Sequence, residues 1–168
     1  MKSEQAFERE LTELLSRLRR FAHALSRNAA DADDLTQATV ERALRSRRQW
    51  QPGTRLDSWL YRIMRNLWID TARARARMER HEAPEEEALT VGEDPREALE
   101  SLSELRRAMA AMERLPDEQR EVVALILVEG FGYREVSEML DLPIGTVSSR
   151  LVRGRTALLT MLGGTADG

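Results

Sequence analysis

Residues 133–159, YREVSEMLDLPIGTVSSRLVRGRTALL, contain the strongest structural signal in the chain. A helical pattern of apolar and polar residues over YREVSEML stops at the turn DLP, and a longer helical pattern starts at Gly145. A short helix, a turn of about three residues and a longer second helix have the spacing of a helix-turn-helix. The sequence therefore predicts this motif in the C-terminal part of the chain.

The second helix of the motif has the composition of a DNA-reading helix. Its apolar residues step by three, four and seven and predict one buried stripe, made of Ile144, Val147, Leu151 and Leu158. No acidic residue occurs between Asp141 and Asp167. Small polar side chains and arginines on one helix can meet base edges and phosphates in a major groove. The candidate DNA-binding residues are Thr146, Ser148, Ser149, Arg150, Val152, Arg153 and Arg155.

Within this set we expect Arg153 and the serines to read bases, with Arg150 and Arg155 on the phosphates. Gly154 either brings the helix backbone unusually near the DNA or is a tolerated neutral residue. A plainer interpretation of the motif is a solvated helical hairpin whose arginines serve solubility.

The N-terminal part of the chain predicts three or four helices. Apolar positions follow helical spacing over 7–25, 34–45 and 57–77, and a turn with Pro52 and Gly53 separates the last two. Asn28 and the acidic cluster at 31–34 are expected to end one helix and cap the next. These segments form a compact helical domain over 1–78.

Charge is distributed unevenly along a chain whose net charge is −3. Residues 1–78 have a net charge of +6, residues 79–104 a net charge of −8, and residues 105–168 a net charge of −1. The acidic stretch contains Pro84 and Pro95 and has no sustained period, which predicts a flexible linker. We therefore predict an all-α protein with two small helical domains, 1–78 and 105–162, joined by the acidic linker, and a frayed tail at 163–168.

Composition argues against most enzyme classes. The chain has no cysteine, and its two histidines are far apart in sequence, so thiolate metal sites, a catalytic cysteine and a serine–histidine triad are not expected. Asp31, Asp33 and Asp34 resemble a metal site in chemistry, but carboxylates just before a helix are more often caps. We expect no catalytic residue, no cofactor and no metal. With no apolar run long enough to span a bilayer and no signal sequence, we expect a cytoplasmic protein.

Three fragments resemble, in order and spacing, a bacterial RNA polymerase sigma factor of the extracytoplasmic-function type. They are DADDLTQATVERALR (31–45), SWLYRIMRNLWIDTARARAR (58–77) and the long C-terminal stretch 115–159 that contains the helix-turn-helix. The resemblance covers about 7–77 and 105–162, and the combination of fragments is far more specific than any one of them.

The resemblance implies a dissociable subunit that binds core RNA polymerase and promoter DNA. The first domain would bind the clamp helices of the β′ subunit through the DLTQ helix and open the −10 element. The second domain would read the −35 element and rest on the β flap. An anti-sigma factor that occludes both domains is the expected inhibitor. Residues implied for polymerase binding are Asp34, Leu35, Gln37 and Glu41, and those implied for the −10 element are Trp50, Arg62, Arg65, Asn66 and Arg73.

Trp50 lies in the loop RQWQPGT, which resembles the loop that caps a flipped −10 base, and an aromatic ring there can stack on a base. Packing in the core is an equally good interpretation for Trp50, and it is the favoured one for Trp59 and Trp68.

Two other functions remain open from the sequence. A sigma-like decoy would sequester an anti-sigma factor without binding a promoter, but such a decoy should have lost the arginines that this chain keeps in both domains. A simple helix-turn-helix repressor explains the last third of the chain and leaves the basic first domain without a role.

Overall fold

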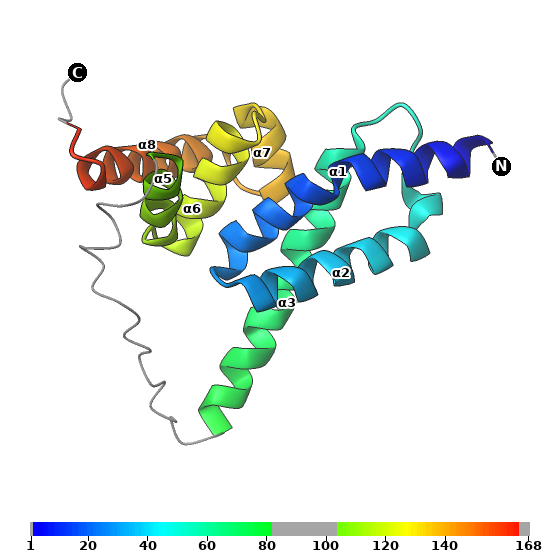
Figure 1. Ribbon diagram of the computed structural model, residues 1–168, viewed down its shortest axis with the longest axis horizontal. Coiled ribbons are helices and arrows are strands. Elements are labelled where there is room, and N and C mark those ends of the chain that lie inside the picture. Colours follow the sequence, from blue (N-terminus) through cyan, green and yellow to red (C-terminus); the bar gives the residue numbers. More distant parts are fainter. Residues whose placement is uncertain (1, 82–103, 165–168) are drawn as a thin grey trace.

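A computed structural model describes residues 2–81 and 104–164, and every regular element in those ranges is helical (Figure 1). The predicted all-α class is confirmed. The helices form two groups, which we call the N-terminal unit (α1–α3) and the C-terminal unit (α5–α8). Most of the predicted acidic linker, residues 82–103, lies outside the described residues, as does the end of the predicted tail, residues 165–168.

The N-terminal unit contains three long helices and one short turn of helix. These are α1 (Lys2–Ser26), α2 (Ala29–Arg45), the 3₁₀ turn η1 (Arg47–Gln49) and α3 (Leu56–His81). In Figure 1, α1 and α2 lie side by side and α3 crosses them. Fully buried side chains from all three helices form the core of the unit: Leu18, Phe21, Ala43, Leu60, Tyr61 and Met64.

Helix α2 begins five residues earlier than the sequence predicted. Asn28 is its N-cap, with the side-chain oxygen accepting a hydrogen bond from the Asp31 amide at 2.8 Å. The aspartates predicted as caps therefore lie inside the first turns of the helix. Asp31 accepts two hydrogen bonds from Arg75 of α3, at 2.7 and 2.9 Å, so this carboxylate joins two helices.

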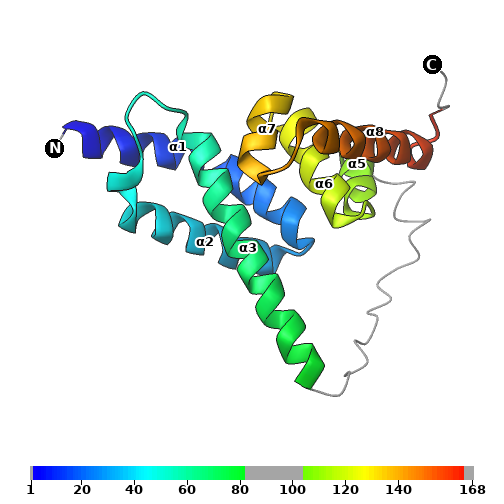
Figure 2. The ribbon, with the colours of Figure 1, turned by 180° about the vertical axis from the view of Figure 1, so that it is seen from behind.

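Helix α3 continues beyond the predicted end of the first domain. It runs to His81 instead of ending near residue 78, and its C-terminal half projects away from the rest of the molecule (Figures 1 and 2). Residues 70–80 are all exposed, whereas Leu56, Leu60 and Met64 near its start are buried. One helix thus supplies both a core element and a free basic arm.

The C-terminal unit confirms the predicted helix-turn-helix. Its elements are α5 (Glu104–Glu113), α6 (Asp117–Val123), the π-helical turn η2 (Ala124–Val128), α7 (Tyr133–Leu140) and α8 (Ile144–Met161). The turn between α7 and α8 is closed by Asp141 in the left-handed conformation, φ 54°, and by Ser137 Oγ, which donates to the Leu142 carbonyl at 2.5 Å.

Gly154 is buried where α8 passes α6. A Cβ atom at this position would lie 2.7 Å from Val123 Cγ2, closer than van der Waals contact allows. The sequence left two interpretations open for this glycine, a close approach to DNA and a tolerated neutral residue. The structure instead shows a close approach to α6, which holds the second motif helix against the core.

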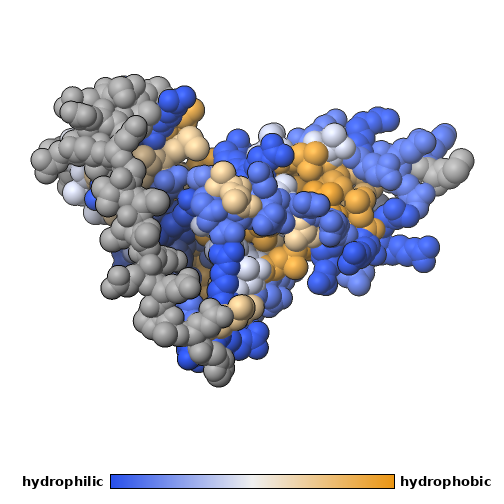
Figure 3. Space-filling view, turned by 60° about the horizontal axis from the view of Figure 1, so that its bottom comes forward, coloured by the Kyte–Doolittle hydropathy of each residue, from blue (hydrophilic) through white to orange (hydrophobic). Residues whose placement is uncertain are grey.

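The two units pack against each other. Helix α3 lies against α7, and α1 lies against α6 and η2, so that buried apolar residues of both units form one continuous core. The face shown in Figure 3 is largely polar, with apolar side chains gathered over the N-terminal unit. Among the described helices, none combines the length and the apolar character that a membrane span needs.

Candidate nucleic-acid and polymerase interface

The outer face of α8 presents most of the residues predicted to read DNA. Ser149, Val152, Arg153 and Arg155 are exposed, and Val152 retains 60 % of its accessible surface. An exposed apolar side chain between a serine and an arginine is suited to contact with a thymine methyl group. The exposed face of α8 thus combines hydrogen-bond donors, positive charge and one apolar contact.

The remaining predicted residues of α8 lie at the edge of this face. Thr146 and Ser148 are half-buried, and Thr146 accepts a hydrogen bond from Ser149 through its carbonyl. Arg150 is also half-buried, with Nη2 3.6 Å from Glu118 Oε2 on α6. Ile144 departs from the predicted buried stripe, since it remains 47 % exposed at the first turn of α8.

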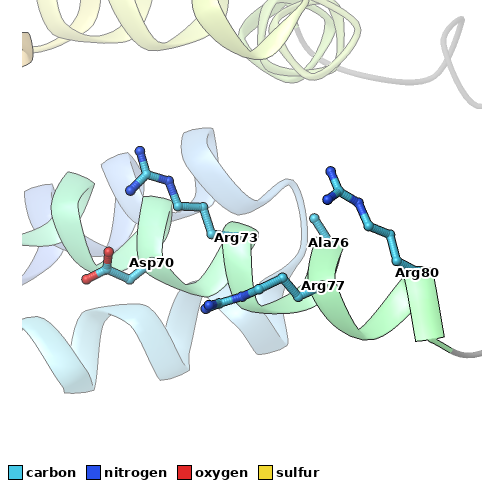
Figure 4. Close-up of a pocket in the computed structure, with 5 residues that line it drawn as sticks. All are labelled: Asp70, Arg73, Ala76, Arg77 and Arg80. Carbon is cyan, nitrogen blue, oxygen red and sulfur yellow. The ribbon is translucent and has the colours of Figure 1, made fainter.

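The free arm of α3 forms a second basic surface. Arg73, Arg77 and Arg80 line a shallow pocket together with Asp70 and Ala76 (Figure 4). In that view Arg73 and Arg80 extend from the same side of the helix and Arg77 from a neighbouring side. All three arginines are exposed and one carboxylate lies among them, which is the charge pattern of a surface that follows a phosphate backbone.

Two residues predicted to bind the −10 element are engaged elsewhere. Arg65 donates from Nε to Glu121 Oε1 of α6 at 2.5 Å, and its side chain retains 19 % exposure. Arg62 donates from Nη2 to the Glu138 carbonyl of α7 at 2.9 Å. Asn66 is exposed beside them. The structure brings these residues together on one stretch of α3 and covers part of that stretch with the C-terminal unit.

Trp50 is half-buried instead of lying free in its loop. Its ring lies 5.7 Å from the Phe7 ring of α1, and Phe7 in turn meets Trp59 at 6.3 Å. The indole Nε1 of Trp50 is buried without a hydrogen-bond partner in the described part of the chain. Trp50 therefore anchors the 47–55 loop to α1, and the packing expected for Trp59 and Trp68 against the core is confirmed.

The predicted polymerase-binding residues divide between the surface and the interior of α2. Asp34, Gln37 and Glu41 are exposed and, spaced by three and four, lie on one face. Leu35 is 5 % exposed and belongs to the core. The exposed face of α2 is polar and acidic. Leu35 fixes α2 to the core of the unit, so that this face points to solvent.

A buried cluster around Glu129 was not predicted from the sequence. The Glu129 side chain, 1 % exposed, comes from the C-terminal unit just after η2. Its carboxylate accepts hydrogen bonds from Arg17 Nε at 2.9 Å, Arg20 Nε at 2.8 Å and Tyr61 Oη at 2.9 Å. All three donors belong to the N-terminal unit. We call this set of three residues, Arg17, Arg20 and Tyr61, the Glu129 socket.

The contact between Glu129 and its socket determines the protonation states of Glu129 and Tyr61. Burial raises the pKa of the Glu129 carboxyl, but the hydrogen bonds from Arg20, Arg17 and Tyr61 outweigh it and hold the pKa below its ordinary value. Burial and the neighbouring carboxylate raise the pKa of Tyr61. Glu129 is therefore charged and Tyr61 neutral at physiological pH, the states that keep the hydrogen bonds formed.

Phe131 adds an apolar contact next to the socket. Its ring is 2 % exposed and meets the Tyr61 ring edge to face at 5.4 Å. The Arg55 guanidinium lies over the Phe131 ring, 4.6 Å from the ring centroid, and donates to Glu135 of α7 at 2.6 Å.

A further contact joins the units at the end of α1. Arg120 of α6 is 1 % exposed and donates to the carbonyls of Ala24 and Leu25 as well as to its own neighbour Asp117. Arg27 reaches back to the Asp117 carboxylate at 2.7 Å. Burial lowers the pKa of Arg120.

No local signal in the sequence could have identified these contacts. Glu129 ends an apolar helix, a common place for a charged residue, and its three partners lie 68 to 112 residues away. Charged residues at such separations pair only once the fold has brought their helices together.

The two units of the structure correspond to two segments that match known protein families. Residues 11–78 match the family model of sigma-70 region 2, and residues 105–158 match that of sigma-70 region 4. The chain is 42 % identical to the ECF RNA polymerase sigma factor SigE of Mycolicibacterium smegmatis over 84 % of its own length and 56 % of that protein's. It is 38 % identical to the ECF sigma factor EcfG of Rhodopseudomonas palustris, over 86 % of this chain and 78 % of the relative.

A solved structure has a similar fold along nearly the whole chain. The sigma factor RpoE of Bartonella quintana, determined in complex with the anti-sigma factor NepR, superimposes with a TM-score of 0.77 and 31 % identity. The alignment covers 95 % of this chain and 98 % of that one. The two family matches and the relatives aligned along most of the sequence show that the chain belongs to the ECF group of the sigma-70 family of RNA polymerase sigma factors.

Proposed function

We propose that this chain is a promoter-specificity subunit that binds core RNA polymerase, recognises −10 and −35 elements and is controlled by an anti-sigma factor. It contributes binding and base recognition, and the polymerase core performs nucleotidyl transfer. The observation that carries the proposal is the pair of exposed basic surfaces, one on the free arm of α3 and one on α8, each within a segment that matches a sigma-70 region.

Each surface has a proposed role. Residues 1–78 form the domain that binds the polymerase and the −10 element, with Asp34, Gln37 and Glu41 facing a basic partner surface such as the β′ clamp helices. Residues 105–162 form the −35 domain, which also rests on the β flap, and 79–104 form the linker. Ser149, Val152 and Arg153 read bases while Arg155 contacts a phosphate.

On the −10 side, Arg73 follows the DNA backbone beside Asn66, and Arg62 and Arg65 join it when they are released from the C-terminal unit. In this proposal Trp50 anchors its loop to α1, because its ring is packed on Phe7. The loop residues that follow it, 51–54, are exposed, so they are available to meet an extruded base.

An anti-sigma factor is proposed as the inhibitory partner. The similar Bartonella sigma factor was solved in complex with one, and its fold matches this chain across both units. A protein that holds the units together prevents them from reaching two separate promoter elements.

Run-off transcription tests the proposal. Bacterial core polymerase, a genomic promoter pool and the purified chain should give discrete transcripts that core alone does not give. Arg73→Ala should reduce them strongly because Arg73 lies on the exposed basic arm, whereas Arg106→Ala, also an exposed arginine but on α5, should not. No transcripts together with tight binding of an anti-sigma factor would instead establish the decoy function.

A further inference from the structure

The first turns of α1 carry a single buried side chain. Among residues 2–10 only Phe7 is buried, with 3 % of its surface exposed. These turns lie before residue 11, where the match to sigma-70 region 2 begins. None of the surfaces proposed to bind polymerase or DNA includes Phe7, so its contacts are the evidence for what these turns do.

Phe7 holds the residue at which the exposed loop of residues 51–54 begins. We call these four residues the −10 loop. The segment between η1 and α3 passes across the N-terminal part of α1 (Figures 1 and 2), and there the Phe7 ring lies 5.7 Å from the Trp50 ring. Phe7 also meets the Trp59 ring of α3 at 6.3 Å, so it joins the start of the loop to two helices.

Ring contacts alone fix Trp50 in this position. Its indole Nε1 is buried and has no hydrogen-bond acceptor in the described part of the chain. A buried donor without an acceptor does not stabilise the packed ring. The contact with Phe7 is therefore the anchor of Trp50 on α1.

The same turns of α1 also hold the short helix that precedes the loop. Glu4 Oε1 lies 3.0 Å from Arg47 Nη2 of η1. The side chains of Arg47 and Glu4 retain 40 % and 53 % of their exposure, so this ion pair contributes little stability. It adds a second point of attachment, and Phe7 supplies most of the stabilisation.

The −10 loop keeps its own shape but buries none of its residues. The amide and the hydroxyl of Thr54 both donate to the Gln51 carbonyl, at 3.2 and 2.6 Å. Gly53, at φ 90°, stands where a type II turn needs a glycine. Because residues 51–54 are all exposed, the position of this turn on the molecule depends on what anchors its ends, and at its start that anchor is Trp50.

We propose that the first turns of α1 are a positioning element for the −10 loop, in which Phe7 sets the place of residues 51–54 against the extruded −10 base. Because Phe7 is buried, it acts through Trp50 and does not touch DNA. Hydrogen bonds to a base edge weaken steeply when the donor or acceptor is displaced, so a loop discriminates bases only as well as it is placed. The proposal rests on the proposed function for the role of the loop.

Phe7→Leu in the full chain tests the proposal, with Leu18→Val as the matched control. Both substitutions remove part of a buried apolar side chain from α1, but position 18 lies about 16 Å further along the helix. Because the sequence has no cysteine, a fluorophore on Gln51→Cys, an exposed position, reports the freedom of the loop through its anisotropy in the absence of polymerase.

Competition transcription measures base discrimination. Bacterial core polymerase and the chain are given one promoter isolated from the genomic pool, together with copies that carry single-base changes in the −10 or the −35 element. The ratio of transcripts from the original and the changed templates gives the preference at each position. A loss of folded protein lowers every transcript and leaves this ratio unchanged, so the ratio separates positioning from stability.

Phe7→Leu should lower the anisotropy at position 51 and reduce the preference for the original −10 element by about fivefold, the low end of what one base contact provides. Preference at the −35 element should stay as in wild type, because α8 is unchanged. Leu18→Val should leave both readouts as in wild type. The proposal is overturned if Phe7→Leu leaves the loop as ordered as in wild type, frees it without loss of −10 preference, or weakens preference at the two elements equally.

Trp50→Leu provides the same test from the side of the loop and decides it if Phe7→Leu fails to fold. It should lower the anisotropy and the −10 preference as Phe7→Leu does. The double variant should lose little more than either single one, because both substitutions remove the same contact. Additive losses would show that the two residues act separately and would contradict the proposal.

The two proposals fail in different ways. A wild-type chain that gives no promoter-dependent transcripts refutes the proposed function and this role with it. A wild-type chain that discriminates at the −10 element, beside a Phe7→Leu chain that discriminates equally well, refutes only the role of Phe7.

Discussion

Glu121 and Glu129 are two buried carboxylates of the same unit, both paired with arginines of the other unit, yet their pKa values shift in opposite directions. Burial raises the pKa of Glu121, and the attraction and hydrogen bond of Arg65 do not compensate. At Glu129 the penalty of burial is exceeded by three hydrogen bonds, and the pKa falls. The contact of Glu121 with Arg65 is the shorter one, at 2.5 Å.

The difference shows that a short contact does not by itself make a buried ion pair favourable. Removing a carboxylate from water costs several hydrogen bonds. Among the described residues Glu121 recovers one charged donor, whereas Glu129 recovers two charged donors and the Tyr61 hydroxyl. The partners of Glu129 are also partly solvated, since Arg17 and Arg20 retain 30 % and 48 % of their side-chain exposure. Glu129 is thus the stabilising contact of the interface, and Glu121 is a tolerated one.

The largest expected effect separates the two carboxylates directly. Glu129→Gln should lower the free energy of unfolding by about 2 kcal/mol, below the usual cost of breaking a buried pair because its arginines reach solvent. Glu121→Gln should change it by less than about 0.5 kcal/mol, because it also removes a desolvation penalty. Urea denaturation at neutral pH measures both, and equal losses would contradict the comparison.

Removing the arginine instead of the carboxylate should reveal the penalty at Glu121. Arg65→Gln should cost about 1–2 kcal/mol, since it leaves a buried carboxylate without its charged donor. In a Glu121→Gln background the same substitution should cost almost nothing. A double-mutant cycle by urea denaturation gives the coupling, and an Arg65→Gln cost that persists in the Glu121→Gln background would show that Arg65 acts through other contacts.

The pH dependence of stability should have opposite signs at the two sites. The lowered pKa of Glu129 contributes stability that is present above its ordinary value of 4.5 and is lost as the pH falls through the folded-state pKa. The raised pKa of Glu121 contributes stability that is present below 4.5 and is lost as the pH rises through its folded-state pKa.

The opposite pH dependence is tested by measuring the free energy of unfolding between pH 3 and pH 7 in wild type and in each Glu→Gln variant. This range extends about two pH units around the usual carboxyl pKa. Relative to wild type, Glu129→Gln should be least harmful at the acid end and Glu121→Gln least harmful at the neutral end. Parallel profiles for the two variants would show that the carboxylates titrate alike.

The smallest effect extends the comparison to Asp31, a half-buried carboxylate near the surface with several donors. Hydrogen bonds from Arg75 and Asn28 lower the pKa of Asp31 from 3.8 to about 2, although Arg75 is half exposed. Arg75→Gln should return the pKa of Asp31 towards 3.8 in a carbon-detected NMR titration. The free energy of unfolding should change by less than about 0.5 kcal/mol, because solvent screens the pair. A larger loss of stability would mean that the pair fixes α3 against α2.

The elements whose signal is local were predicted well. The helices at 133–140 and 144–161 and the turn between them follow from periodicity and turn chemistry, and the long helices of the first unit follow from the same pattern. Predictions failed where a competing local choice existed. Asn28, one of the cap candidates, caps α2, so the helix starts before the predicted Asp34 and the aspartates lie inside it. The end of α3 at His81 was missed because residues 70–80 are exposed on every side and carry no apolar pattern.

The candidate site divides in the same way. Exposed residues of α8 such as Arg153 could be assigned from helical spacing and the family resemblance, and their exposure agrees with that assignment. The positions of Trp50, Arg65 and Gly154 could not, because each depends on a neighbour distant in sequence. Phe7 packs on Trp50, Glu121 holds Arg65, and Val123 leaves no room for a side chain at Gly154.

By itself the sequence determined the helical class, the helix-turn-helix and the family, because periodicity, caps and turn residues act over a few positions and are written directly in the chain. Only the tertiary structure decided that the two units pack together and that Glu129 enters a socket of Arg17, Arg20 and Tyr61. The free energy of a buried charge depends on how many donors surround it in space, and that number exists only after helices far apart in sequence have met.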